Sequence, residues 1–109
     1  MGTRLYRVEK IVYANECTIG YGDGTDKLWE LMEEQANYQN EHEFEISVEL
    51  LENIINCNMT NLIELMKEEE RDEVVKIIKE VPDYAIANIR NDIEIEKKTG
   101  NEWILYKVF

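Results

Sequence analysis

The stretch DIEIEKKTGNEWILYKVF, residues 92–109, decides the predicted fold class. Polar and apolar residues alternate strictly over 92–96, and a period of two is typical of a half-buried strand. The residues of 99–101, Thr-Gly-Asn, are types that favour a turn. The apolar and aromatic residues of 103–109 then predict a return strand, so the whole stretch indicates a β-hairpin.

Another strand is predicted near the opposite end of the sequence, over residues 4–13. The segment RLYRVEKIVY is rich in aromatic and β-branched residues and mixes polar with apolar positions. Between the two ends, apolar residues recur at helical spacing. The predicted fold class is therefore α+β: a small antiparallel sheet, made of an N-terminal strand and a C-terminal hairpin, covered on one face by three or four amphipathic helices.

The first helix is predicted over residues 28–38. It follows three glycines placed alternately over residues 20–24, which mark a turn. Either Thr25 or Asp26 can cap this helix, because a side-chain oxygen can accept an N–H of its first turn. Apolar residues at helical spacing give the helix an inner face, while its glutamates face outward.

Further along, the alternation of 43–46 predicts a short strand, and Ser47 suits the N-cap of a helix over 48–57. Helical spacing continues through residues 60–81 with a cap predicted at Thr60, and it fits either one kinked helix or two. Pro82 ends that helical region, because proline has no N–H and disfavours helical geometry in the residue before it. Residues 83–91 fit either a short helix or a further strand.

Composition places the chain among acidic globular proteins. Its 109 residues predict a single domain over 1–109, and the net charge is −12 with an isoelectric point near 4.5. No apolar run reaches the roughly 20 residues that a membrane span needs, and residues 1–10 lack a secretion signal. We therefore expect a cytoplasmic protein with no membrane partner, in which Cys17 and Cys57 are reduced, although a disulfide between them is the alternative.

Motifs for chemistry are sparse. The glycine turn lies between a strand and a helix, where such loops can bind phosphate, but its spacing matches no phosphate-binding motif and Asp23 and Asp26 would repel an anion. His42 is the single histidine, which excludes zinc sites built on paired histidines. We predict no cofactor, no metal site and no catalytic residue.

One enzymatic alternative remains open. Pro82-Asp83, followed by Glu96-Lys97-Lys98, resembles the loose motif of the PD-(D/E)xK nuclease superfamily. The resemblance implies that Asp83 and Glu96 lie on adjoining strands and bind Mg²⁺, while Lys98 supports the attacking water. Against this alternative, a charge of −12 repels the nucleic acid backbone.

The distribution of charge is the most informative feature. No lysine or arginine lies between Leu28 and Met66, although this segment carries nine glutamates. Unbalanced carboxylates repel one another, so they cost stability, whereas they can steer a basic surface toward the protein. The residues predicted to bind a partner are Glu30, Glu33, Glu34, Glu41, Glu45, Glu49, Glu52, Glu64 and Glu68.

The predicted function is that of a non-enzymatic interaction module whose partner is a basic, nucleic-acid-binding protein rather than nucleic acid itself. Its carboxylates would replace phosphates on the partner's binding surface, so that the module inhibits the partner. Small size and a bias toward Asn, Ile, Lys and Glu resemble the style of phage and mobile-element proteins, which indicates an anti-defence role. The alternatives are the nuclease, and a structural or regulatory subunit whose acidity serves solubility.

Overall fold

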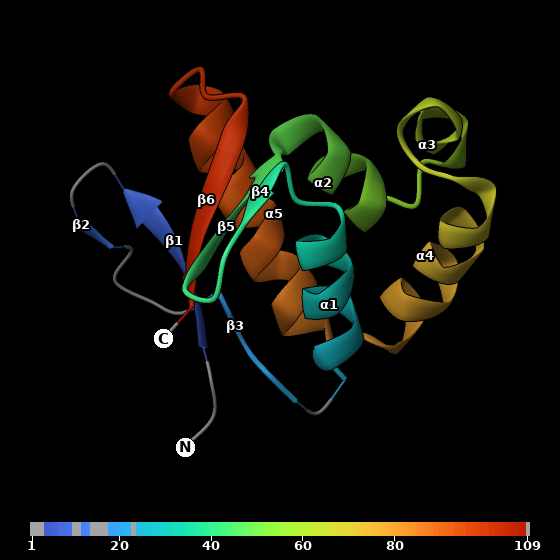
Figure 1. Cartoon of the computed structure of the whole chain (residues 1–109), viewed down its shortest axis with the longest axis horizontal. Coiled ribbons are helices and arrows are strands. Elements are labelled where there is room, and N and C mark those ends of the chain that lie inside the picture. Colours follow the sequence, from blue (N-terminus) through green and yellow to red (C-terminus); the bar gives the residue numbers. More distant parts are fainter. Residues whose placement is uncertain (1–3, 10–11, 14–17, 23, 109) are drawn as a thin grey trace.

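The computed structural model describes residues 4–9, 12–13, 18–22 and 24–108, and these residues form an antiparallel sheet and five helices (Figure 1). The strands are β1 (Arg4–Glu9), β2 (Val12–Tyr13), β3 (Ile19–Gly20), β4 (Tyr38–Gln39), β5 (Glu43–Ser47) and β6 (Trp103–Val108). Their order across the sheet is β2-β1-β6-β5-β4, with β3 also paired to β1. The predicted α+β class is confirmed.

One face of the sheet is covered and the other is open to solvent. In the antiparallel register Phe44 pairs with Tyr106 and Ile46 with Ile104, and all four side chains are buried. On the opposite face, Glu45 pairs with Leu105, and both are only partly buried. The sheet therefore has the alternation expected of a strand layer with helices on one side, as predicted.

The helices are α1 (Asp26–Glu34), α2 (Val48–Ile55), α3 (Met59–Leu65), α4 (Glu68–Glu80) and α5 (Asp83–Lys98). Helices α1, α2 and α5 contact the sheet, whereas α4 packs on α1 and α3 and lies farther from the strands (Figure 1). A hydrophobic core runs from Leu5 on β1 to Tyr106 on β6. Ser47 caps α2 as predicted, because its hydroxyl accepts the N–H of Leu50 at 3.3 Å.

The predicted C-terminal hairpin is wrong in its first half, since residues 92–96 belong to helix α5. This helix also includes residues 83–91, for which the sequence allowed either helix or strand. Thr99 and Gly100 end it with a Schellman cap: Gly100, at a φ of 77°, donates to Lys97 O, and Asn101 donates to Glu96 O. The glycine that suggested a hairpin turn is therefore the C-terminal cap of a helix.

The segment over 60–81 forms two helices, α3 and α4, separated by extended backbone at Met66 and Lys67. The predicted cap at Thr60 is wrong. The side chain of Asn58 accepts the N–H of Asn61 at 3.3 Å instead, so α3 begins at Met59. An asparagine one turn before the apolar run satisfies the same unpaired N–H groups as a threonine.

Helix α1 ends at Glu34, four residues before the predicted end at 38, because the chain turns back so that β4 pairs with β5. Thr25 occupies the N-cap position, but its buried hydroxyl lies within hydrogen-bonding distance of Gly20 O and Gly22 O rather than of a helix N–H. The segment over 4–13 is two paired strands, β1 and β2, and not one.

Candidate functional site

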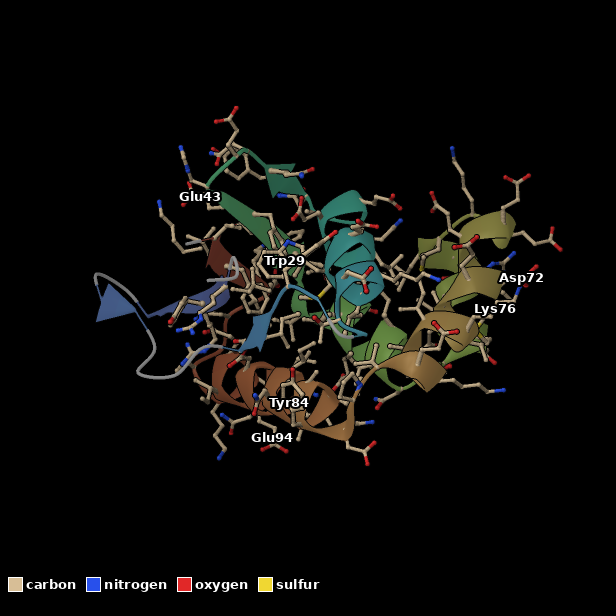
Figure 2. The ribbon with its side chains drawn as sticks, turned by 90° about the horizontal axis from the view of Figure 1, so that it is seen from below. Trp29, Glu43, Asp72, Lys76, Tyr84 and Glu94 are labelled. Atoms are coloured by element: carbon tan, nitrogen blue, oxygen red, sulfur yellow. The ribbon has the colours of Figure 1, made fainter. Side chains whose placement is uncertain are left out.

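A cleft of about 520 Å³ lies between helices α1 and α4 and is the principal candidate site. Its acidic walls carry six glutamates against two lysines, which leaves a formal charge of −4. The side chains that line it are Lys27, Glu30, Leu31, Glu34, Glu69, Glu70, Glu73, Lys76, Ile77 and Glu80. Figure 2 shows α1 and α4 side by side, with Lys76 and Asp72 labelled on α4.

Helical spacing places these residues on two facing stripes. On each helix the lining positions recur at intervals of three and four residues, so their side chains share one face. Leu31 and Ile77, which are 5% and 7% exposed and belong to the hydrophobic core, are the apolar residues that line the cleft and form its floor. The carboxylates stand around this apolar floor, where a partner's side chains would be partly removed from water.

Gly24 fixes the distance between the helices at one end. Its φ is +92°, and a Cβ atom at this position would lie 3.1 Å from Glu80 O and 3.3 Å from the Cδ atom of Pro82. The turn before α1 therefore packs directly on the end of α4. Only glycine combines this backbone geometry with so close an approach.

The charges of the cleft are weakly compensated. Lys27 Nζ lies 3.9 Å from Glu80 Oε2, and both side chains are about two-thirds exposed, so this pair contributes little. Gln35 donates to Glu70 at 3.1 Å, and Tyr21 donates its hydroxyl to Glu30 at 2.8 Å, which raises the pKa of Tyr21. The other cleft carboxylates face solvent and can accept hydrogen bonds from a partner.

The residues predicted to bind a partner do not share one surface. Glu30 and Glu34 lie in the cleft, and Glu68 is the exposed first residue of α4. The others occupy different places: Glu41 is in the β4–β5 turn, Glu45 on the open sheet face, Glu64 on α3, and Glu49 and Glu52 on α2.

Some of the carboxylates that looked unbalanced in the sequence have partners from distant segments. Lys97 on α5 lies 2.9 Å from Glu52, and Lys107 on β6 lies 3.9 Å from Glu43. Glu33 accepts hydrogen bonds from the indole N–H of Trp29 and from Gln39, so its partly exposed carboxylate already has partners within the protein.

Four cleft glutamates were absent from the predicted set: Glu69, Glu70, Glu73 and Glu80. Lysine and arginine residues lie between these glutamates in the sequence, so the four glutamates fall outside the segment that lacks basic residues and their shared helical face was not recognised. The signal that could have found them is the spacing of 69, 73, 76 and 80 around the apolar position 77, which marks one helical face.

The residues of the nuclease-like motif are not brought together. Asp83 begins α5, while Glu96 and Lys98 lie at its other end. The two acids are thirteen positions apart on the helix, which places them roughly 20 Å from each other at 1.5 Å per residue. The motif needs both acids on adjoining strands within reach of one cation, and α5 provides no such arrangement.

Glu96 instead belongs to a buried polar network with Arg7 and Asp92. Arg7 Nη1 lies 2.8 Å from Glu96 Oε1, and Arg7 Nε lies 3.4 Å from Asp92 Oδ1. Asp92 Oδ2 accepts hydrogen bonds from Thr18 at 2.6 Å and from Tyr106 at 3.0 Å. This network joins β1, β6 and α5 inside the fold.

Burial raises the pKa of Asp92 from its ordinary value of 3.8, while hydrogen bonds from Thr18 and Tyr106 and the charge of Arg7 oppose the shift. The pKa of Tyr106 is raised well above 10.0, first by burial and then by Asp92. The network is closed to solvent, so we assign it to structure rather than to catalysis.

The raised pKa of Asp92 predicts a pH-dependent stability. Between the ordinary and the raised pKa the folded state binds more protons than the unfolded state, so the free energy of unfolding falls as pH rises through that window. Asp92→Asn removes this dependence. We expect the stability of wild type relative to Asp92→Asn to decrease from about pH 4 to pH 7, measured by urea unfolding. A relative stability that increases with pH would contradict this expectation.

The sequence also predicted that the protein has no metal site and no membrane span, and that its two cysteines are reduced. In the described part of the chain, no group of three or more His, Cys, Asp or Glu side chains could hold a metal ion, and no helix is long and apolar enough to cross a membrane. His42 is exposed in the β4–β5 turn. Cys17 and Asp23 lie outside the described residues. Cys57 is half-buried at the end of α2, and burial raises the pKa of its thiol.

Comparison of the chain with models of protein families, with curated proteins and with solved structures finds no match.

Proposed function

We propose that this protein is a non-enzymatic, cytoplasmic interaction module, and that the acidic cleft between α1 and α4 binds a basic surface of a protein partner. The observation that carries the proposal is the convergence of six glutamates from two helices around an apolar floor. Electrostatic attraction of this kind speeds encounter with a basic partner and sets its orientation.

The same charge supports the class of partner that we propose. Surfaces that bind nucleic acid are basic, since most of their affinity comes from contacts to phosphates. Carboxylates spaced along two helices can take the place of those phosphates. The function we propose is therefore inhibition, in which the module occupies the nucleic-acid-binding surface of its partner, in the manner of a phage or mobile-element anti-defence protein.

Charge reversal tests the cleft. We expect Glu34→Lys combined with Glu73→Lys to weaken binding of an oligolysine peptide about tenfold, because the two changes place cations on both walls. Isothermal titration calorimetry gives the affinity, and the wild-type affinity should fall steeply as salt rises from about 0.05 to 0.5 M.

The matched control carries the same change of charge outside the cleft. Glu64 and Asp72 are exposed, do not line the cleft, and Asp72 points away from α1 in Figure 2. Glu64→Lys with Asp72→Lys should weaken binding much less. Equal losses in the two variants would mean that bulk charge and not the cleft attracts the peptide, which favours acidity as a solubility feature.

Displacement tests the inhibitor proposal. A basic partner captured from the host should release a labelled nucleic acid when the protein is added, and the cleft variant should be a weaker competitor. Simultaneous binding of the protein and the nucleic acid to the partner would contradict mimicry.

A further inference from the structure

A second groove, of about 470 Å³, lies where the sheet meets the ends of α2 and α5. Figure 1 shows β6 beginning beside both helices. The groove is lined by Ser47, Val48, Glu49, Glu52, Lys97, Asn101, Glu102 and Trp103. None of these residues lines the α1–α4 cleft, so the groove is a separate surface.

Trp103 is the notable side chain of this groove. It is the first residue of β6 and pairs with Ser47, and it is 42% exposed. The other tryptophan, Trp29, is 3% exposed and contributes to the core. A backbone hydrogen bond from Val48 N to Glu102 O, at 2.9 Å, fixes the chain next to Trp103. An indole on a paired strand with so much exposed surface offers a ready contact to a partner.

The charged residues that line the groove together with Trp103 are mostly acidic, which favours a cation. Lys97 pairs with Glu52 at 2.9 Å, whereas neither Glu49 nor Glu102 has an ion-pair partner among the described residues. The face of an indole attracts cations, and nearby carboxylates strengthen that attraction. The groove therefore combines an aromatic surface with two carboxylates that no lysine or arginine of the described chain compensates.

We propose that this groove binds an arginine side chain of a basic protein segment. The planar guanidinium can lie against the indole while its N–H groups donate to Glu49 and Glu102, and a lysine ammonium can satisfy only part of this arrangement. The inference does not depend on the cleft, because it rests on different residues. It gives the protein a second point of contact at which arginine is distinguished from lysine.

The test uses the whole protein and three short blocked peptides that carry arginine, lysine or citrulline at the same positions. Citrulline keeps the shape of arginine without its charge. The protein carries Glu34→Lys and Glu73→Lys, so that binding at the cleft is suppressed. The two indole N–H signals in a ¹⁵N spectrum are assigned with Trp103→Phe, and Trp29 serves as an internal reference.

We expect the arginine peptide to shift the Trp103 indole signal and to leave that of Trp29 in place. The lysine peptide should bind several-fold more weakly, and the citrulline peptide should produce no shift. Trp103→Ala should reduce the affinity about fivefold or more, and Glu49→Gln with Glu102→Gln by a similar factor. These residues are surface-exposed, and far-UV circular dichroism verifies that each variant folds.

The proposal is overturned if the arginine peptide leaves the Trp103 signal unchanged, if lysine or citrulline binds as tightly as arginine, or if Trp103→Ala retains the wild-type affinity. Failure here leaves the cleft proposal intact, since oligolysine binding by the protein with its native cleft is measured separately.

Discussion

Replacing Arg7 by methionine is expected to destabilise the protein by about 3–5 kcal/mol, because Asp92 and Glu96 then remain buried without a compensating charge. Arg7 is 3% exposed, and the two acids are each 6% exposed. Methionine fills a similar volume, so the loss reports on charge more than on packing. Chemical denaturation followed by circular dichroism gives the change in free energy of unfolding.

Two further variants serve as controls for Arg7→Met. Arg90 is exposed and donates to Asn56, so Arg90→Met should cost less than about 1 kcal/mol. Adding Asp92→Asn and Glu96→Gln to Arg7→Met should recover most of the loss, since no buried charge is then left unpaired. A cost for Arg7→Met no larger than that of Arg90→Met would mean that the network does not hold β1 to α5.

Gly24→Ala is expected to cost about 2–3 kcal/mol, the second largest effect that we predict. Part of the cost is backbone strain at a φ of +92°, and part is the contact of the new Cβ atom with Glu80 O and Pro82. Because this contact joins the turn before α1 to the end of α4, the substitution should also weaken oligolysine binding at the cleft. Thermal unfolding and calorimetry measure the two effects.

Gly100→Ala is the matched control for the strain alone. Gly100 has a φ of +77°, but a Cβ atom there would meet nothing within 4 Å. Its replacement should cost about 1 kcal/mol and leave cleft binding unchanged. Equal losses at the two glycines would show that the close approach at Gly24 contributes nothing.

Elements that depend on neighbouring residues were predictable from the sequence. The alternation of 43–46 indicated β5, and Ser47 indicated the start of α2, because both signals arise within a few residues. Helix α5 was not predictable in its second half. Asp92 and Glu96 lie on its inner side, and acids are normally placed toward water, so the pattern appeared to alternate. Arg7, which makes their burial tolerable, is more than eighty residues away.

The candidate site was predictable only in part for the same reason. The absence of basic residues between Leu28 and Met66 identified an acidic protein, and it pointed correctly to Glu30 and Glu34 as exposed acids. The opposite wall of the cleft comes from α4, some forty residues later, and only the packing of α4 on α1 brings the two walls together. Lysines from α5 and β6 neutralise acids that looked unbalanced.

The central position of β6 has a consequence for the synthesis of the protein. Strands β1 and β5 both pair with β6 and not with each other, and β6 comes last in sequence among the strands of the described residues. During synthesis on the ribosome, the edges of β1 and β5 that pair with β6 therefore stay unpaired until residues 103–108 emerge. The helices between these strands can already form at that stage. Unpaired strand edges invite association with other chains. We expect the dense negative charge of the intervening segment to oppose such association during that interval, because like-charged chains repel one another.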